Sequence, residues 1–484
     1  MSKKIVVIAA FSHPEYKEKK KKNKAYIDVY WDCALHIDGH PIDVVDYYKL
    51  KHPTKRPRHV YNNGIVLSNY FRQKGALVHL INSMSEADEH DWDEIRQANA
   101  VVISTGYPGY GKRLDNIVNL SKEIKKHNPN IQILIGGWEI YRALRKQDPW
   151  YDKFLKELYK AGADNVIGSR QGLEIAWKYI DEYPLFRGVL YDKKDYPPVD
   201  ASLYSVNNLP KKYQSTHTAI TTTDGCPFNC NFCSYKILHD KISYLEISDI
   251  KNILDNLHKN RQTPLKHIRL ADECLNYPYE RIIQICELIK NLPYDFKWSC
   301  FIRVGNVDKK MAKAMSEARC EFVSMGVESG DEAMRKRMNK FISNDDIRKA
   351  IELFKKYGIK SVLSLIVGYY GENDESLENT KNMLEKLQPD IAKINIWYPT
   401  PDEMNNQHAH TYKLHFTDKG WQHDTMNEKT AYAKAAWLYR ETKKVAFSPP
   451  FISVFDLWPW FQGEGLNSEK IMNIIWDYYN KSKK

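Results

Sequence analysis

Short runs of β-branched and apolar residues recur along the chain and alternate with longer stretches of helical character. Five such runs lie in the first third, at residues 4–10, 76–81, 100–105, 131–137 and 163–168. Strands that are buried on both faces have this composition, and their alternation with helices is typical of a parallel sheet covered on both sides. The sequence therefore predicts an α/β fold that begins with a doubly wound, Rossmann-like sheet over residues 1–182. Residues 12–60 fit no element of this pattern, and we interpret them as an insertion after the first strand.

Three loops of the predicted sheet carry glycine and aromatic residues just after a strand. They are TGYPGYGK at 105–112, GGWE at 136–139 and GSRQG at 168–172. Ligands of open parallel sheets bind beyond the carboxyl ends of the strands, and glycine lets a large flat ligand approach the backbone. None of the loops is a dinucleotide turn or a P-loop. Glycines that only make turns are the alternative.

A second series of strands and helices follows a proline-containing stretch at 183–215, which we interpret as a linker. Its predicted strands lie at 218–223, 267–272, 297–303, 322–327, 361–368 and 391–397. One helix is expected over 308–318, and another begins at Ser343, which forms an S-x-x-D capping signature with Asp346. Six units are two short of a closed eightfold barrel. The sequence predicts a partial (β/α)6 barrel over 216–400, followed by a mainly helical segment over 401–484.

Three of the eight cysteines lie within eleven residues, GCPFNCNFCSY at 225–235. The others are too scattered for a disulfide framework, so we expect a reducing, cytoplasmic setting. Clustered thiolates bind zinc or iron–sulfur clusters. His239 could complete a Cys3His zinc site, or the cysteines could only pack. A 4Fe–4S cluster with three protein thiolates and one open iron would explain why no fourth cysteine is near.

The chain carries a formal net charge of +11, part of it in the block KEKKKKNK at 17–24. Such a block can bind nucleic acid, but no aromatic residues interleave with it, so a solvated lysine-rich loop is the simpler interpretation and we do not expect nucleic acid as a partner. No signal peptide and no apolar run of about 18 residues is found, and neither secretion nor a membrane span is indicated.

The second series of elements resembles the radical S-adenosylmethionine (SAM) enzymes over about residues 216–400. The resemblance rests on the three cysteines with Phe232, and on the stretches RLADECL at 269–275, WSCFIR at 298–303 and GVESGDEAMRKRMNK at 326–340. It implies that Cys226, Cys230 and Cys233 bind a 4Fe–4S cluster. The residues that it implies for SAM are Phe232, Asp272, Glu273, Arg303, Glu328, Ser329 and Tyr398. Glu273, or else Asp272, would contact the SAM amino group, and Arg303 and Glu328 its carboxylate or ribose. GYYGENDES at 368–376 departs from the usual G-x-P-G-E-T loop.

The first sheet resembles the cobalamin-binding domain of class B radical SAM enzymes, most typically at HNPNIQILIGG, residues 127–137. The lower-ligand motif D-x-H-x-x-G is absent, and only His13 remains in its place. The resemblance implies cobalamin contacts from Gly106, Tyr107, Pro108, Gly136, Gly137, Trp138 and Gly168. It also implies that the loops of this sheet face the mouth of the barrel.

Together these features lead us to expect a cobalamin-dependent radical SAM methyltransferase. It would cleave SAM reductively and transfer a methyl group to an unactivated carbon or phosphorus of a small-molecule or peptide substrate, with an electron donor such as flavodoxin or ferredoxin. Two alternatives stay open. The same cofactors could support a rearrangement, ring contraction or cyclisation, or the chain could be an iron–sulfur redox sensor or nucleic-acid-binding protein. The aromatic stretch at 447–465 would line a substrate cavity or pack in a core.

Overall fold

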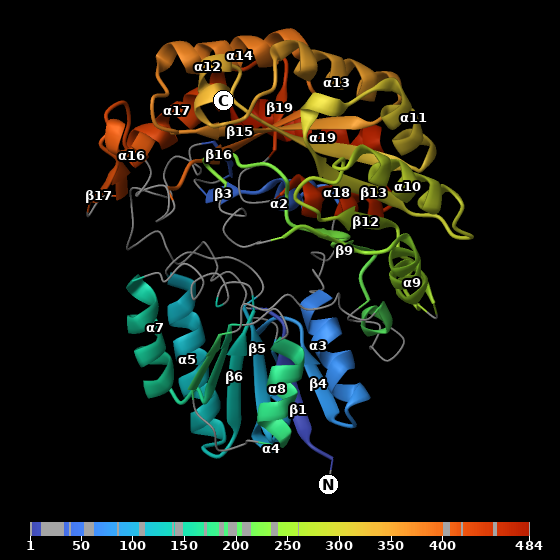
Figure 1. Cartoon of the computed structure of the whole chain (residues 1–484), viewed down its shortest axis with the longest axis vertical. Coiled ribbons are helices and arrows are strands. Elements are labelled where there is room, and N and C mark those ends of the chain that lie inside the picture. Colours follow the sequence, from blue (N-terminus) through green and yellow to red (C-terminus); the bar gives the residue numbers. More distant parts are fainter. Residues whose placement is uncertain are drawn as a thin grey trace. The chain divides into compact units, whose positions relative to one another are not determined.

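We describe the protein from a computed structural model (Figure 1). The described residues are 2–10, 33–37, 40–52, 62–84, 87–105, 112–137, 140, 149–168, 172–182, 188–191, 201–205, 214–233, 241–259, 261–399, 407–417, 420–448 and 453–483. The chain divides into two compact units. Unit 1 comprises residues 1–16, 59–214 and 248–263, and unit 2 comprises residues 17–58, 215–247 and 264–484. Over the described residues, we find no helix with the length and apolar character that crossing a membrane requires.

Unit 1 is built on a parallel sheet with the strand order β4-β1-β5-β6-β7-β8. The strands are β1 (Lys4–Ile8), β4 (Leu77–Ile81), β5 (Ala100–Ser104), β6 (Gln132–Gly136), β7 (Asn165–Gly168) and β8 (Gly188–Tyr191). The five predicted strands are all present. The sixth, β8, lies in the stretch that we interpreted as a linker, so that prediction was wrong at these residues. Four residues bounded by prolines carry too little pattern to reveal an edge strand.

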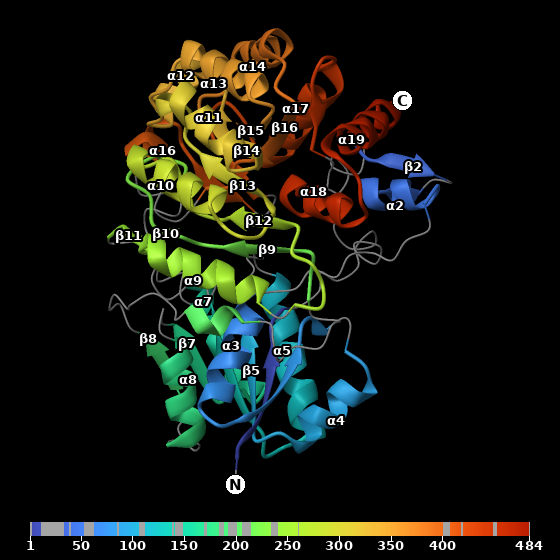
Figure 2. The same cartoon turned by 90° about the vertical axis from the view of Figure 1, so that its right-hand side faces the viewer.

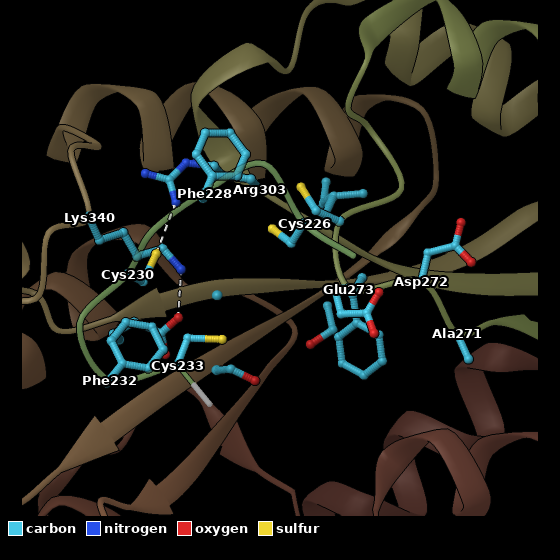
Figure 3. Close-up of a pocket in the computed structure, with 17 residues that line it drawn as sticks. Cys226, Phe228, Cys230, Phe232, Cys233, Ala271, Asp272, Glu273, Arg303 and Lys340 are labelled. Atoms are coloured by element: carbon cyan, nitrogen blue, oxygen red, sulfur yellow. Dashed lines mark hydrogen bonds and ion pairs between the residues drawn. The ribbon is translucent and has the colours of Figure 1, made fainter. Parts of the chain in front are cut away.

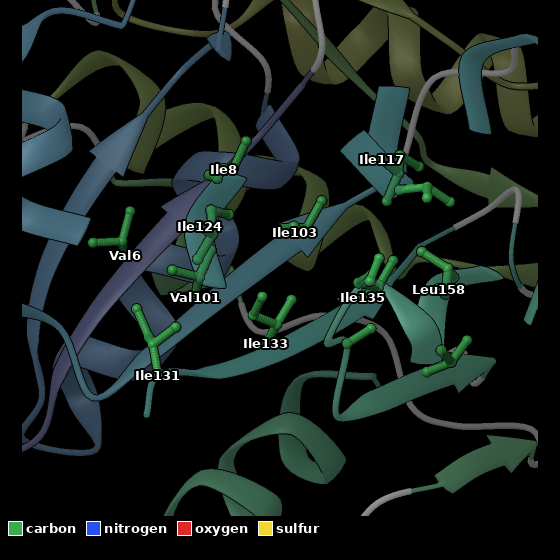
Figure 4. Close-up of a cluster of buried hydrophobic side chains, with 14 of the residues drawn as sticks. Val6, Ile8, Val101, Ile103, Ile117, Ile124, Ile131, Ile133, Ile135 and Leu158 are labelled. Carbon is green, nitrogen blue, oxygen red and sulfur yellow. The ribbon is translucent and has the colours of Figure 1, made fainter. Parts of the chain in front are cut away.

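Helices cover both faces of this sheet, as the doubly wound prediction requires. Isoleucines and valines of β1, β5 and β6 pack on one face against α4 (Glu89–Gln97), α5 (Lys112–His127) and α7 (Pro149–Lys160) (Figure 4). On the other face lie α3 (Asn62–Gln73) and α8 (Gly172–Asp181), through Phe71 and Ile180 among others. Residues of β1 alternate between these two cores, Val6 and Ile8 to one and Ile5 and Val7 to the other, because successive side chains of a strand point to opposite faces.

Unit 2 contains a parallel sheet with the order β19-β16-β15-β14-β13-β12-β9. Its strands are β9 (His217–Ile220), β12 (His267–Leu270), β13 (Lys297–Ile302), β14 (Cys320–Glu328), β15 (Lys360–Val367), β16 (Ile391–Ile396) and β19 (Ala446–Phe447). The six predicted strands follow each other across the sheet in chain order, as a partial barrel requires. The short strand β19 extends the edge beyond β16 and was not predicted, because its two residues become a strand only by pairing with Ile391 and Ala392.

The outer face of this sheet is covered by α10 (Tyr279–Lys290), α11 (Lys309–Glu317), α12 (Glu332–Arg337), α13 (Asn344–Lys356) and α14 (Asp374–Leu387) (Figure 2). The indole of Trp298 on β13 donates to the carbonyl of Ala318, just after α11, at 2.7 Å. Trp298 therefore faces outward, and Ser299, Phe301 and Arg303 face the interior of the barrel. The predicted cap of α13 is confirmed: Ser343 and Asp346 form a reciprocal capping box.

The C-terminal segment is mainly helical, with α16 (Gln407–Thr411), α17 (Glu428–Glu441), α18 (Val454–Gly463) and α19 (Ser468–Ser482) and the hairpin of β17 (His415–Thr417) and β18 (Gly420–Gln422). Helix α18 packs on the inward side of the sheet. The ring of Phe455 lies 4.4 Å from that of Phe301 and 5.1 Å from that of Phe322, and Trp458 lies 5.5 Å from Phe322. Phe455 and Trp458, which belong to the aromatic stretch at 447–465, therefore pack in a core.

The described part of the predicted insertion forms β2 (Leu35–Ile37), β3 (His40–Ile42) and α2 (Val44–Lys49). We assigned this stretch to the first domain, but its residues group with unit 2. The hydroxyl of Tyr478 on α19 donates to the carbonyl of Ile42 at 2.9 Å, and Tyr47 hydrogen-bonds Asp477. The insertion thus packs against the C-terminal helix.

Candidate functional site

A cavity of about 300 Å³ opens at the carboxyl ends of the strands of unit 2. Most of the side chains predicted there line it (Figure 3): Cys226, Cys230, Cys233, Phe232, Asp272, Glu273, Arg303 and Glu328. They come from the loop after β9 and from the ends of β12, β13 and β14. The partial barrel thus brings together residues that are about a hundred positions apart in the sequence.

The cysteine loop is tied to the barrel by its backbone and by Asn231. The amide of Asn231 donates to the carbonyl of Met338 at 2.9 Å, and its side chain donates to the carbonyl of Arg337 at 3.0 Å. Cys230 is buried, and Cys226 and Cys233 are half-buried. Over the described residues, no three His, Cys, Asp or Glu side chains are grouped as the ligands of one metal ion. His239 lies outside the described residues.

Positive charge surrounds the thiols. The guanidinium of Arg303 donates to the sulfur of Cys230 at 3.6 Å. A hydrogen bond from the Cys274 thiol lowers the pKa of Cys226 to about 6, helped by the Phe228 amide and by the charges of Arg303 and Lys340, against the opposing effect of burial. The same hydrogen bond and burial raise the pKa of Cys274, which therefore stays a thiol. Thiolates are the form that binds iron, and cations nearby favour that form. The residues present therefore fit a cluster.

Arg303 is held in place from both ends. Its amide donates to the side-chain oxygen of Asn276 at 2.9 Å, and its carbonyl accepts from the side-chain nitrogen of Asn276 at 2.7 Å. The guanidinium lies over the ring of Phe228, 4.0 Å from the centroid. A planar cation stacked in this way is pre-organised for a carboxylate.

Glu328 ends β14 in the left-handed conformation, with φ of 69°. Its carboxylate accepts from the ammonium of Lys340 at 2.6 Å, and both side chains are 7% exposed. Lys340 lines the cavity and lies 5.7 Å from the ring centroid of Phe232. Sequence reasoning missed Lys340, although it closes the stretch that carries the resemblance. Nothing in its local pattern indicates that the chain returns to Glu328 after α12.

The two acidic residues after β12 differ in their partners. Both oxygens of Asp272 accept from Thr222, one from the amide and one from the hydroxyl, each at 2.6 Å. Figure 3 shows the Asp272 carboxylate turned away from the cysteines. Glu273 points into the cavity, and burial, together with the charges of Asp224, Asp272 and Cys226, raises its pKa to about 8. Glu273 was the first choice from the sequence, and its contact with the SAM amino group stays a prediction.

Two predicted residues of this set do not line the cavity. The hydroxyl of Ser329 is buried, accepts from the amide of Asp331 at 3.1 Å and lies 3.3 Å from the hydroxyl of Thr380. Tyr398 is 44% exposed, and its ring lies 6.0 Å from that of Phe416. Their SAM contacts stay predictions.

In unit 1, Gly106, Tyr107, Pro108 and Trp138 lie outside the described residues, as does His13. Gly136 and Gly168 end β6 and β7. Gly137 has φ of 116°, and a Cβ there would lie 2.8 Å from the amide nitrogen of Thr105. Thr105 donates through its amide to the carbonyl of Gly136 at 2.6 Å. Close packing of two strand ends therefore already accounts for Gly137, and the cobalamin contacts stay predictions.

Residues 220–384 match the family model of the radical SAM superfamily. This part of the chain is similar to the radical SAM domain. The chain is 30% identical over 183 residues to an uncharacterised methyltransferase of Pyrococcus horikoshii, covering 38% of this chain and 39% of that protein. It is 28% identical over 298 residues to the anaerobic magnesium-protoporphyrin IX monomethyl ester cyclase of Cereibacter sphaeroides, covering 56% of this chain and 47% of that protein. The chain thus spans about half the length of these relatives or less.

The fold of the whole chain is similar to that of a radical SAM methyltransferase, TsrM from Kitasatospora setae, in a structure with cobalamin and a [4Fe-4S] cluster bound. The TM-score is 0.63 at 11% identity, over 100% of this chain and 99% of that one. The cobalamin-dependent radical enzyme OxsB gives a TM-score of 0.50 at 17% identity, over 79% of this chain and 52% of that one. These likenesses confirm the predicted order of a Rossmann-like unit, a partial barrel and a helical C-terminal part.

Proposed function

We propose that the protein is a cobalamin-dependent radical SAM methyltransferase. It would cleave SAM reductively at a 4Fe–4S cluster and methylate an unactivated carbon or phosphorus of a small-molecule or peptide substrate, with flavodoxin or ferredoxin as the electron donor. The observation that carries the proposal is the cavity of the radical SAM domain, where Cys226, Cys230 and Cys233 meet Arg303, Lys340 and Glu273. The similarity in fold to TsrM over the full chain supports the cobalamin part.

When bound, the cluster supplies the electron that cleaves SAM into a radical that abstracts hydrogen, and cobalamin supplies the methyl group. The three cysteines would hold the cluster as thiolates, which Arg303 and Lys340 favour through their charge. The Arg303 guanidinium is placed to bind a carboxylate in the same cavity. Glu273, protonated near neutral pH because burial raises its pKa to about 8, would donate a hydrogen bond to a neutral amino group that approaches it.

The walls of the cavity limit access of water to this chemistry. Phe228, Phe232 and Phe301 line it, and the ring of Phe455 on α18 lies 4.4 Å from that of Phe301. A dry site strengthens the charge interactions and keeps reactive species from side reactions. In this arrangement the protein positions its ligands, and the cofactors supply the reactivity.

A cyclisation or other rearrangement is the second candidate. It is favoured by the similarity to the magnesium-protoporphyrin IX monomethyl ester cyclase, which extends over 56% of this chain. The radical SAM cavity is compatible with either outcome, because both begin with cleavage of SAM. They differ in whether a methyl group leaves SAM.

The test uses the full chain, reconstituted anaerobically with iron, sulfide and cobalamin and then reduced. We expect about four irons per chain and production of 5′-deoxyadenosine. We also expect mass spectrometry to show transfer of a deuterated methyl group from labelled SAM to cobalamin. The variant with alanine at Cys226, Cys230 and Cys233 should lose iron and SAM cleavage together, whereas the alanine variant of Cys286, a buried cysteine on α10, should retain both. Retention of four irons by the triple variant would overturn the cluster assignment. SAM cleavage without methylation of cobalamin would leave the second candidate.

A further inference from the structure

Two cations point into the barrel behind the cavity. Arg269 on β12 is two residues after His267, whose ring bonds to the inward-facing Ser299, so both point inward. Lys393 on β16 is the register partner of Ser364, which lines the cavity from β15. Cross-strand partners share a face of the sheet, so Lys393 also points inward. Arg269 and Lys393 therefore both face the interior of the barrel, and Arg269 precedes the cavity-lining Ala271 by two residues.

Neither cation has a hydrogen bond or an ion pair among the described residues. The guanidinium of Arg269 lies 5.6 Å from the ring centroid of Phe455 on α18, and its buried Nε has no hydrogen-bond partner in the described part of the chain. Burial lowers the pKa of Lys393, and the charge of Arg269 lowers it further, whereas Asp456 on α18 opposes the shift. The two cations and one carboxylate therefore share one region of the interior.

The other titratable groups around this region do not balance the charge. His267 on β12 is fully buried and hydrogen-bonded to Gln462 and Ser299 at 2.8 and 2.9 Å, and burial lowers its pKa to about 3, so it is neutral. Glu321 accepts hydrogen bonds from Gln462 and Ser468, and its carboxylate lies on the side of His267. Among the charges that act on Lys393, Asp456 is therefore the carboxylate that stands against the two cations. An isolated interior cation is costly unless a partner neutralises it.

We infer that Arg269 and Lys393 bind an anionic group of the substrate, a carboxylate or a phosphate, inside the barrel. That the bound anion belongs to the substrate rests on the proposed function. The group is distinct from the SAM carboxylate, which Arg303 would bind at the strand ends. A guanidinium and an ammonium that have no protein partner give such an anion charge-assisted hydrogen bonds in a region of low dielectric.

The inference can be tested without knowing the substrate. The full chain, with its cluster reconstituted and SAM bound so that the SAM site is filled, is titrated calorimetrically with succinate, inorganic phosphate and the neutral analogue succinamide. We expect succinate or phosphate to bind and succinamide not to bind. Arg269→Met and Lys393→Met should each weaken anion binding at least tenfold, and Arg269→Lys and Lys393→Arg should bind the anion more tightly than the methionine variants because the charge is kept.

Lys360→Met is the matched control, because this lysine of β15 already pairs with Asp390 at 2.9 Å, and it should bind anions like the wild type. Near-ultraviolet circular dichroism of each variant checks that the barrel is folded. Absence of anion binding by the wild type, equal binding of succinamide, or unchanged binding by both methionine variants would overturn the inference. Failure of the wild type to form 5′-deoxyadenosine would overturn the proposed function instead. Anion binding is measured without turnover, so its result does not depend on that outcome.

Discussion

At the scale of single residues, a buried carboxyl shapes the loop after β15. Glu372 is 1% exposed and accepts from the amide of Gly368 at 2.6 Å. Burial raises its pKa to about 8, with the Gly368 amide opposing and the charge of Asp331 adding to the shift. The loop departs from the G-x-P-G-E-T pattern in sequence, but it retains a glutamate that closes it on its own backbone.

Glu372→Gln should make the protein less sensitive to pH. The pKa of Glu372 is higher in the folded state than its unfolded value of about 4.5. Its contribution to the unfolding free energy is therefore fully present below pH 4.5 and is lost as the pH rises toward 8. Glutamine keeps an acceptor for Gly368 without a charge. We expect the variant to gain about 3 kcal/mol in unfolding free energy relative to the wild type between pH 5 and pH 8, measured in urea. Glu375→Gln, at an exposed position of α14, is the control. Parallel pH profiles for wild type and Glu372→Gln would contradict the assignment.

Arg303→Lys should weaken SAM binding more than folding. The ammonium cannot reproduce the two parallel hydrogen bonds of a guanidinium or its stacking on Phe228 at 4.0 Å, whereas the backbone contacts with Asn276 remain. We expect at least a tenfold higher Kd for SAM by equilibrium dialysis and a melting temperature within a few degrees of the wild type. Arg348→Lys, on the surface of α13, should change neither. Wild-type affinity for SAM in the Arg303 variant would show that the arginine serves the thiols alone.

The sequence predicted the site residues that lie at a short, fixed distance after a strand. It did not predict residues that reach the site only through the tertiary fold. The three cysteines and Glu273 follow directly from a strand end, and they line the cavity as predicted. Lys340 reaches Glu328 from beyond the far end of α12, twelve residues later, and Glu328 itself is left-handed, which no local pattern favours in a glutamate. A contact of this kind depends on tertiary structure.

At the scale of elements, most strands of the two parallel sheets were predicted, including the edge strands β4 and β9, whereas the edge strands β8 and β19 were not. β8 and β19 are four and two residues long, and they exist through pairing with β7 and β16. The sequence also left open whether the aromatic stretch at 447–465 lines a cavity or packs. Periodicity cannot distinguish a helix in a core from a helix in a ligand site, and only the contacts of α18 decide it.

Trp458→Ala should destabilise unit 2. The side chain is 1% exposed and its ring lies 5.5 Å from that of Phe322, so truncation leaves a cavity between α18 and β14. We expect a loss of about 3 to 4 kcal/mol in unfolding free energy, measured by urea denaturation. Trp458→Phe should cost less, because the indole nitrogen has no hydrogen-bond partner in the described part of the chain. Phe341→Ala, at a side chain that is 70% exposed, is the control, and an equal loss there would contradict the packing argument.

At the scale of the whole molecule, the class and order of the folds were predicted, and the position of the insertion was not. The spacing of apolar residues in strands and helices is a local property of the sequence, so it was enough to predict two α/β units. The insertion packs through Tyr47 and Asp477 and through Ile42 and Tyr478, pairs that lie more than four hundred residues apart. Nothing near residue 40 indicates that its partner is the last helix of the chain.

The last prediction concerns the lower face of bound cobalamin. The motif D-x-H-x-x-G is missing after β1, so we expect no histidine of the protein to coordinate cobalt. The reconstituted full chain, reduced to cob(II)alamin, should give an electron paramagnetic resonance spectrum without nitrogen superhyperfine splitting. His13→Ala should leave that spectrum unchanged. Splitting that disappears in the His13 variant would instead identify His13 as a ligand, since a coordinating imidazole nitrogen couples directly to the unpaired electron on cobalt. Failure of the wild type to bind cobalamin would remove the methyltransferase proposal and leave the proposal of a radical SAM enzyme whose first unit has another role.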